Sequence, residues 1–198
     1  MPRIKADTVA EHVAQQRAAV LEAAIGLFTT NGYHEVSLGD IAAEVGLARN
    51  SLYRYVPDKT HLLVEWYRHA VPRTIAEWRA VTAGDDDPPT RLQRWAQAYL
   101  EWANSPEHQL VAPLTDALGA LDDDTRREVA DLHRSMMDVV AQVVRDAQVP
   151  ADQVDGTVDL LAGLVLGAAR AEKVRGADAA VTRRLDAAIT AVLAAPSP

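Results

Sequence analysis

Arg49 and Asn50 carry side-chain groups that can read the edges of DNA bases. An arginine guanidinium can bridge the O6 and N7 atoms of guanine, and an asparagine carboxamide can bridge N6 and N7 of adenine. A good bidentate contact of this kind discriminates between bases by about 1–3 kcal/mol. Ala48 lies just before this pair and Ser51 just after it, which makes Ala48 to Ser51 the candidate base-reading set. The plain alternative for Arg49 and Asn50 is a solvated position at the start of a helix.

The residues around this set carry donors that suit phosphate groups. Hydroxyl groups, ammonium groups and the N–H groups at a helix start all donate to the DNA backbone. The candidate phosphate contacts are Ser37, Tyr53, Tyr55 and Lys59. Tyr53 can equally be a core aromatic, and Arg54, the remaining candidate DNA contact, can instead pair with an acid. Arg17 and His34 can approach the backbone too, although a plain surface position accounts for both.

These side chains need a frame, and the segment Leu38–Val56 has the pattern of a helix-turn-helix. Ala42 is the small residue that the first helix needs where the second crosses it, and Gly46, four positions later, suits a left-handed turn. Apolar residues that would lock the two helices together stand at Ile41, Val45, Leu47 and Leu52. These requirements are independent of one another. The segment therefore predicts that Arg49 and Asn50 begin a recognition helix for the major groove.

The longer stretch Arg17–Leu63 resembles the N-terminal domain of the TetR family of regulators. The matching segments are AAVLEAAIGLFTTNGY, in the first helix, and SLGDIAAEVGLARNSLYRYVPDKTHLL after it. Such combined motifs are much more specific than a single match. Val56 departs from the family's usual Phe, which weakens packing under the third helix, and Ala48 departs from its frequent Ser or Thr, which removes one hydroxyl contact to DNA. The resemblance supports the DNA-contacting positions named above.

The spacing of apolar residues predicts an all-α fold of about nine helices. The expected helices are Thr8–Thr30, Ser37–Gly46, a short helix ending at Tyr55 or Val56, Asp58–Ala83, Thr90–Asn104, Glu107–Leu121, Asp124–Gln148, Ala151–Arg175 and Asp178–Ala195. Glycine, proline and aspartate runs break the pattern between them. We expect a three-helix, helix-turn-helix DNA-binding domain at residues 1–57 and a helical ligand-binding and dimerisation domain at residues 58–198.

Large amphipathic side chains on the middle helices are candidates for a small-molecule site. Such sites are mostly apolar clefts with a few polar groups, which Trp, Tyr, Met and His suit, but these residues suit an ordinary core as well. The resemblance implies an effector held between the middle helices. The predicted pocket residues are Trp66, Trp95, Tyr99, Trp102, Leu114, His133 and Met137. The expected effector is a small apolar or amphipathic compound.

The last two helices carry small and apolar residues that predict a dimer surface. Small residues on one stripe of a helix let a second helix approach closely. The predicted interface residues are Leu160, Gly163, Leu164, Gly167, Leu185 and Ile189. One helix-turn-helix reads too few base pairs for specificity, whereas a two-fold dimer reads two half-sites. The resemblance implies a four-helix dimer interface at this place, and the alternative is that these faces are buried within one chain.

Enzymatic and metal chemistry have little support in the sequence. The chain has no Cys, which excludes disulfides, thiolate catalysis and Cys-based zinc sites. His61, Glu65 and His69 share a helix face, but no fourth ligand lies nearby in the sequence, and a solvated polar face is the better interpretation. Catalytic motifs of serine hydrolases, phosphate-binding loops and metalloproteases are missing. We expect no catalytic residue, no metal, no cofactor and no enzymatic activity.

The net charge of −8 is unevenly distributed along the chain. Residues 1–62 carry six Lys and Arg against seven Asp and Glu, and the remainder carries fourteen against twenty-one. A near-neutral N-terminal part can still present its few cations on one surface. The start shows no apolar segment of a signal peptide, and the longest apolar run, Leu160–Ala169, is half of a membrane span. These features predict a cytoplasmic protein without membrane contact.

These observations predict a DNA-binding transcriptional regulator. The expected form is a homodimeric repressor bound to a palindromic, double-stranded operator and released when a small-molecule effector shifts its conformational population. Two alternatives remain. One is a helical protein-interaction module in which the helix-turn-helix serves only structure, and the other is a transcriptional activator that uses the same motif.

Overall fold

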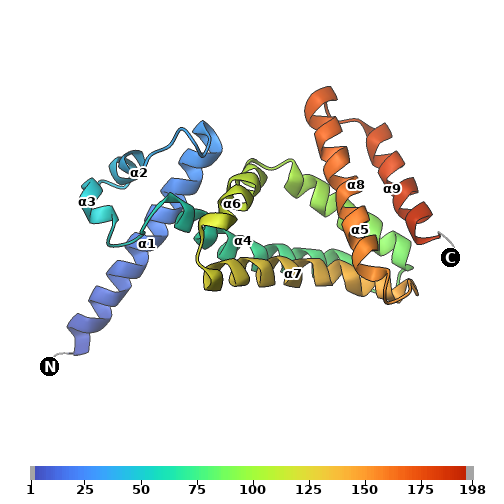
Figure 1. The fold of residues 1–198 in the computed structure, drawn as a ribbon, viewed down its shortest axis with the longest axis horizontal. Coiled ribbons are helices and arrows are strands. Elements are labelled where there is room, and N and C mark those ends of the chain that lie inside the picture. The colour runs from blue at the N-terminus through green and yellow to red at the C-terminus, as the bar shows by residue number, and fades with distance from the viewer. Residues whose placement is uncertain (1–2, 195–198) are drawn as a thin grey trace. The chain divides into compact units, whose positions relative to one another are not determined.

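The computed structural model describes residues 3–194, with side chains from Ala10 onward, and these residues are helical without any strand (Figure 1). The outer ends of both predicted domains, residues 1–2 and 195–198, lie outside the described range, as does the predicted helix end at Ala195. The elements are α1 (Arg3–Asn31), α2 (Leu38–Glu44), α3 (Arg49–Leu52), α4 (Lys59–Thr82), α5 (Pro88–Ala103), η1 (Pro106–Leu110), α6 (Val111–Ala117), η2 (Leu118–Ala120), α7 (Asp123–Asp146), α8 (Val154–Arg175) and α9 (Ala179–Leu193). The all-α prediction is confirmed.

The chain forms two compact units that are not two simple halves of the sequence. The first contains the residues up to His69 together with Gln109–Arg126, and the second contains Ala70–His108 and the residues from Arg127 onward. The predicted domain boundary at residues 57 and 58 falls inside the first unit, because the beginning of α4 completes its core. The functional division at that boundary stays a prediction.

The core of the first unit begins on one face of α1. Val20, Ala24 and Phe28 follow one another at intervals of four and are at most 1% exposed. Such spacing places them one above the other along the helix. The Phe28 ring meets the Tyr33 ring edge-on, with centroids 5.1 Å apart. Gly32 ends α1 with a left-handed backbone (φ +90°), close to the predicted helix end at Thr30.

A capping box starts α2. The backbone N–H of Asp40 donates to the Ser37 hydroxyl (3.2 Å), and the Ser37 N–H donates to the Asp40 carboxylate (2.8 Å). The side-chain hydrogen bond from Ser37, followed by the backbone one, holds the pKa of Asp40 below its ordinary value. After α2 the chain turns at Gly46 (φ +68°), and the Leu47 N–H donates to the Ala42 carbonyl (2.8 Å) to close the turn.

The helix predicted at Glu107–Leu121 is the main departure from the expected elements. The structure instead places η1, α6 and η2 in succession. Pro113 explains the interruption, because proline has no N–H to donate and is tolerated only in the first turn of an α-helix. A new helix therefore begins at Val111, two residues before it. Gln109 ties this segment to the end of α1 by donating to the Thr29 carbonyl (3.0 Å).

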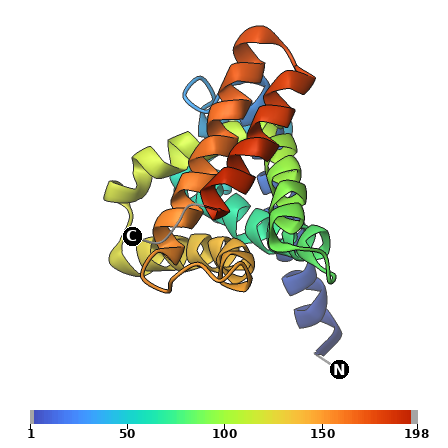
Figure 2. The same ribbon diagram turned by 90° about the vertical axis from the view of Figure 1, so that its right-hand side faces the viewer.

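The second unit is built around α5, which packs against both α8 and α9. Figure 2 shows α8 and α9 lying side by side as a helical pair. Arg91 on α5 contacts the last residues of α4 and α7. Its Nε donates to the Thr82 carbonyl (2.7 Å), and its Nη1 donates to Asp146 (2.8 Å). The Asn104 amide donates to Glu172 of α8 (2.7 Å). Polar contacts thus fix both ends of α5 around an apolar centre.

Pro72 lies inside α4, just after the first unit ends. A proline inside a helix cannot donate a hydrogen bond to the carbonyl four residues earlier, here that of Arg68. Helices bend most easily at such positions. Helix α4, which joins the two units, therefore bends most easily at Pro72, close to the boundary between them.

Gly46 provides a test of the turn between α2 and α3. Gly46→Ala should lower the free energy of unfolding by about 1–2 kcal/mol, because a left-handed backbone is unfavourable for alanine. Crowding does not contribute, since an added Cβ would meet no atom within 4 Å. Gly26→Ala, in the middle of α1 with the same open space, should instead raise it by about 0.5–1 kcal/mol. Urea unfolding followed by circular dichroism measures both, and equal effects would contradict the assigned turn.

Candidate nucleic-acid interface

The recognition helix α3 presents its first two side chains to solvent. Arg49 and Asn50 are exposed, whereas Leu52 is 0% exposed and anchors the helix in the first unit. Ile41 and Ala42 of α2 are buried to the same degree and belong to the same core. Ala48 is the N-cap residue, and its methyl side chain makes no capping hydrogen bond. The guanidinium and the carboxamide are therefore free to reach outward from a fixed backbone.

The residues after α3 differ in how much they expose. Tyr53 is 48% exposed, which favours a surface contact over the core position that the sequence left open. Arg54 is exposed as well, while Ser51 and Tyr55 are half-buried. Val56, at the position where a larger Phe is typical, is buried at 6% exposure. The structure thus leaves three polar side chains, those of Tyr53, Arg54 and, in part, Tyr55, available beside the recognition helix.

Lys59 and Ser37 have partners within the chain. The Lys59 ammonium donates to the carbonyls of Tyr33 (2.6 Å) and Val36 (2.8 Å) and lies 4.2 Å from the centre of the Tyr33 ring. Burial lowers the pKa of Lys59, and the charge of Glu35 opposes that shift. An ammonium has three N–H donors, so one remains for a phosphate. The Ser37 hydroxyl donates to Asp40 (2.7 Å), and phosphate contacts by both residues stay predictions.

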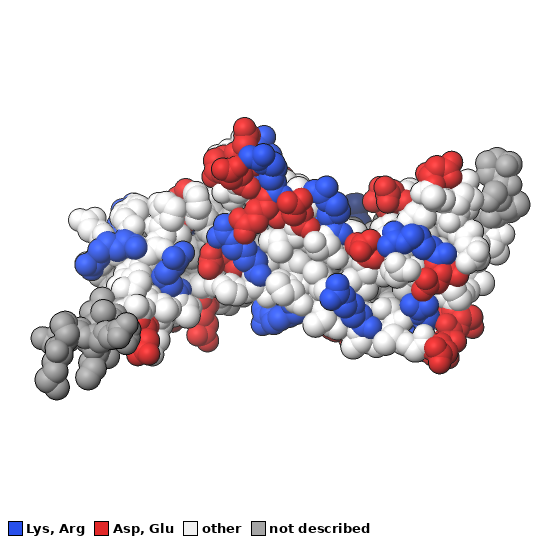
Figure 3. All heavy atoms as spheres, turned by 90° about the horizontal axis from the view of Figure 1, so that it is seen from below, with Lys and Arg blue, Asp and Glu red and all other residues white. Residues whose placement is uncertain are grey.

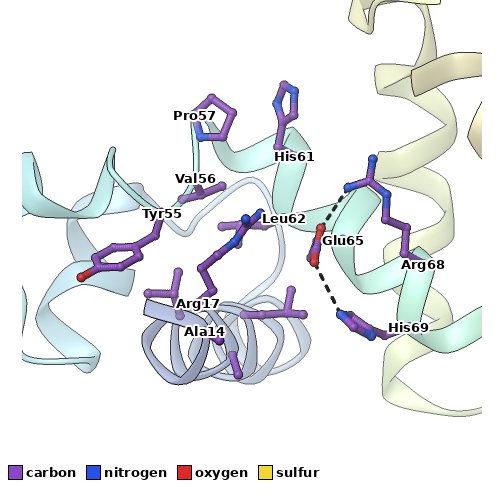
Figure 4. A pocket seen from close by; sticks show the side chains of 13 residues that line it. Ala14, Arg17, Tyr55, Val56, Pro57, His61, Leu62, Glu65, Arg68 and His69 are labelled. Carbon is purple, nitrogen blue, oxygen red and sulfur yellow. Dashed lines mark hydrogen bonds and ion pairs between the residues drawn. The ribbon is translucent and has the colours of Figure 1, made fainter. Parts of the chain in front are cut away.

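A groove of about 380 Å³ lies between α1 and α4 of the first unit, beside the turn that follows α3 (Figure 4). Arg17 and Tyr55 line it together, which adds Arg17 to the cations near the predicted DNA contacts. The sequence treated Arg17 as a plain surface residue, because the spacing along α1 does not reveal which turn faces α4. Glu65, on the opposite wall, accepts from Arg68 (2.9 Å) and lies 3.5 Å from His69.

The side chains of the possible metal site on α4, those of His61, Glu65 and His69, contact other residues or one another. His61 pairs through Nδ1 with Asp58 (2.9 Å), and its backbone N–H donates to the same carboxylate (2.9 Å). Burial opposes the ionisation of Asp58, but the bonds from His61 hold its pKa below the ordinary value. In the part of the chain that the structure describes, no three metal-ligating side chains converge. Asp58 therefore acts as a helix cap at the start of α4.

Comparisons with known proteins agree with this geometry. The family model of the bacterial regulatory proteins, tetR family, matches residues 20–66, which contain α2 and α3. The transcriptional repressor KstR of Mycolicibacterium smegmatis is 27% identical over 140 residues, which are 70% of this chain and 68% of that protein. Together with the fold, these matches support a TetR family transcriptional regulator. Its alignments span 52% to 68% of the lengths of the curated relatives that it matches.

Solved structures of TetR regulators share the fold. A putative regulator from Saccharomonospora viridis, in complex with choline, has a TM-score of 0.67 and 21% identity over 90% of this chain and 95% of that one. FadR of Thermus thermophilus, a repressor in complex with lauroyl-CoA, has a TM-score of 0.61 and 19% identity over 92% of this chain and 98% of that one. At these identities the likeness concerns the fold alone.

The predicted pocket residues are divided between the two units. Trp66 and Leu114 are buried in the first unit, at 2% and 3% exposure. In the second unit, Trp95, Tyr99 and Trp102 are neighbours in an aromatic cluster. His133 is exposed and Met137 is half-buried on α7. The predicted set did not include two further members of the cluster, Trp78 and His108, because they come from other elements and only the folded chain brings them together.

Some of the predicted dimer residues are exposed, and others are buried within the single chain. Leu160 is 53% exposed, and Gly163 and Gly167 on the same helix are exposed too, while Leu164 is half-buried. Leu185 and Ile189 are 5% and 0% exposed within the single chain, where α9 packs against α5 and α8. Leu166, which the sequence did not single out, is 40% exposed. The exposed part of this surface lies on α8, and the dimer interface itself stays a prediction.

Among the described residues, every helix is too short or too polar to cross a membrane.

Lys59→Met tests the structural role of the ammonium group. The substitution leaves two carbonyls without their charged donor and should lower the free energy of unfolding by about 1.5–3 kcal/mol. Lys173→Met removes an exposed lysine of α8 and should change it by less than about 0.5 kcal/mol. Urea unfolding of both variants measures the difference. Similar values for the two would show that the Lys59 contacts do not stabilise the first unit.

Proposed function

We propose that this regulator is a repressor that binds a palindromic operator as a homodimer and leaves it when a small-molecule effector binds. The observation that carries the proposal is the exposure of Arg49 and Asn50 at the start of a helix whose backbone is pinned by buried Leu52. Its relative KstR is named a transcriptional repressor, which supports repression. Action on DNA implies a location in the cytoplasm.

Recognition of the operator combines base and backbone contacts. Arg49 bridges O6 and N7 of a guanine, and Asn50 bridges N6 and N7 of an adenine, in the major groove. Tyr53 and Arg54 donate to phosphates and set the register of the helix on the duplex. Lys59 contributes its remaining N–H. Base contacts supply the specificity, and the phosphate contacts supply an affinity that falls steeply as salt rises.

Local charge rather than net charge governs the approach to DNA. On the face that Figure 3 shows, basic and acidic side chains are interspersed and do not separate into one basic and one acidic region. The chain as a whole carries −8. Long-range attraction therefore contributes little, and binding depends on the few cations beside the recognition helix. We expect a moderate affinity for each half-site, which makes two-site binding by a dimer necessary.

Effector binding in the second unit is supported by its aromatic cluster and by the complexes of fold neighbours with choline and lauroyl-CoA. An effector that binds one conformation better than another shifts the population toward it. Helix α4 runs from the first unit into the second and contains Pro72. A change of bend at this proline is a direct way for the sensing unit to alter the spacing of the two recognition helices in a dimer.

Alanine substitutions test the base contacts. Arg49→Ala and Asn50→Ala should each weaken binding to DNA by about tenfold or more, because each removes a bidentate contact. The DNA is first selected from a random-sequence library with the wild-type protein, and fluorescence anisotropy then gives the dissociation constants. Arg73→Ala, which removes an exposed cation from the part of α4 in the second unit, serves as the control and should change binding less than twofold. Wild-type protein that selects no sequence, or that shows no salt dependence, would indicate a protein-interaction module instead.

Leucine substitutions at exposed glycines test the dimer. A Cβ at Gly163 or Gly167 meets no atom within 4 Å in the single chain, so Gly163→Leu and Gly167→Leu should leave the fold intact. In a dimer that uses this face they would separate the two helices. Sedimentation velocity should show a monomer, and DNA affinity should fall with it. Gly119→Leu, in η2 and equally open, should remain dimeric. Dimers in all three variants would place the interface elsewhere.

A further inference from the structure

The centre of the second unit is an aromatic cluster made of Trp78, Trp95, Tyr99, Trp102 and His108. The two indoles of Trp78 and Trp95 meet edge-on, with centroids 5.6 Å apart, and the Tyr99 ring lies 5.1 Å from the first and 5.6 Å from the second. Trp102 continues the cluster at 5.7 Å from Tyr99, and His108 meets it at 4.6 Å. Trp78 and Trp95 are 0% exposed, whereas Trp102 is half-buried at the edge.

The two innermost indoles have donors without an acceptor. No hydrogen-bond partner lies near Nε1 of Trp78 or Nε1 of Trp95, and both nitrogens are buried. The other such side-chain atom among the described residues is Oδ1 of Asp186, which is an acceptor. Most buried polar groups in folded proteins have a partner, and tryptophan in particular usually finds one. Each of these donors is a group to which a ligand oxygen would restore a lost hydrogen bond.

The same cluster lacks an ionised side chain. Burial raises the pKa of Tyr99 to about 12, which keeps its phenol neutral at physiological pH. Burial, with the charge of Lys173, lowers the pKa of His108 and keeps its imidazole neutral. The buried hydroxyl of Thr82 donates to the Trp78 carbonyl (2.7 Å) and is satisfied. A charged group placed between the innermost indoles would lose its hydration, while the ammonium of Lys173 acts on the cluster at His108.

We infer that the effector is a neutral, flat and largely apolar molecule that carries an uncharged oxygen acceptor, such as a ketone, and that Trp78 and Trp95 donate their indole N–H groups to it. The inference rests on the proposed function and names the chemistry of its effector. The molecule enters where half-buried Trp102 borders the cluster and replaces part of the contact between the rings. Its flat surface takes over the ring packing, and its oxygen takes the two donors.

An organic cation is the sharpest rival, because the faces of aromatic rings attract positive charge. The edges of the indoles, where the N–H groups lie, carry positive potential and repel a cation. The rings pack against one another with centroids 5.1–5.7 Å apart and planes tilted by 37–51°, so either kind of ligand has to displace part of this contact. The unsatisfied groups in this cluster are the indole N–H donors of Trp78 and Trp95, and a hydrogen-bond acceptor is the ligand group that satisfies them.

Matched probes separate these chemistries. Equilibrium dialysis of the full chain measures binding of 2-acetonaphthone, its hydrocarbon analogue 2-ethylnaphthalene, the anion 2-naphthoate and tetramethylammonium. The ketone should bind at least about tenfold more tightly than the hydrocarbon, since it completes two hydrogen bonds. Both ions should bind more weakly than the ketone. Tightest binding of tetramethylammonium or naphthoate, equal binding of ketone and hydrocarbon, or no binding of any probe would overturn the inference.

Variants then test the two donors. Trp78→Phe and Trp95→Phe keep an aromatic ring and remove the N–H, and each should weaken ketone binding by about three- to tenfold while changing hydrocarbon binding less than twofold. Trp102→Phe, in the same cluster, is the control and should leave the ratio of ketone to hydrocarbon affinity unchanged. An equal loss of that ratio in all three variants would overturn the inference.

A measurement on the wild-type protein avoids any dependence on how the variants fold. In a proton–nitrogen NMR spectrum, the ketone should move the indole N–H signals of Trp78 and Trp95 downfield, and the hydrocarbon should not. Unmoved indole signals with bound ketone would contradict the assigned donors. DNA binding without any probe is measured in parallel. Its failure contradicts the proposed repressor, whereas normal DNA binding with no preference for the ketone contradicts only the effector chemistry.

Discussion

The contact of the Lys59 ammonium with the carbonyls of Tyr33 and Val36 is the constraint on which the DNA-binding unit depends. It joins the loop between α1 and α2 to the first residue of α4, and α3 lies in the chain between these two points. A four-residue helix has too few internal hydrogen bonds to hold its own position. The direction in which Arg49 and Asn50 point is therefore fixed by this clamp and by buried Leu52, more than by α3 itself.

Much of this unit could be predicted from the sequence because its signals are local. The small residue at Ala42, the turn at Gly46 and the helix start at Ser37 each depend on neighbours within four positions, and the structure places all of them as expected. The role of Lys59 could not be found in this way. A lysine at a helix start suits a phosphate as well as a carbonyl, and only the fold decides that two carbonyls 23 and 26 residues away come first.

The second unit was predicted in outline but not in detail, for the same reason. Apolar periodicity located α5, α7, α8 and α9, yet it could not tell which apolar face turns inward when a helix carries more than one. Leu185 and Ile189 are buried against the chain's own helices, while Leu160 is exposed, although all three have the same apolar chemistry. Trp78 and Trp95 are 17 residues apart, on helices that the loop around Gly84 brings back together.

The two units differ in whether their polar groups have hydrogen-bond partners. In the first, Ser37, Asp40 and Lys59, which lie on either side of α3 in the chain, have partners within the unit, and these contacts give the rigidity that base recognition requires. In the second, two indole donors are buried without one, which raises the free energy of the ligand-free state. A ligand that satisfies them stabilises its own complex, and it shifts the population as far as it binds one conformation more tightly than the other. Helix α4 links the two units covalently and contains Pro72, the position where it bends most easily. A conformational change in the second unit can therefore reach the DNA-binding unit through this helix.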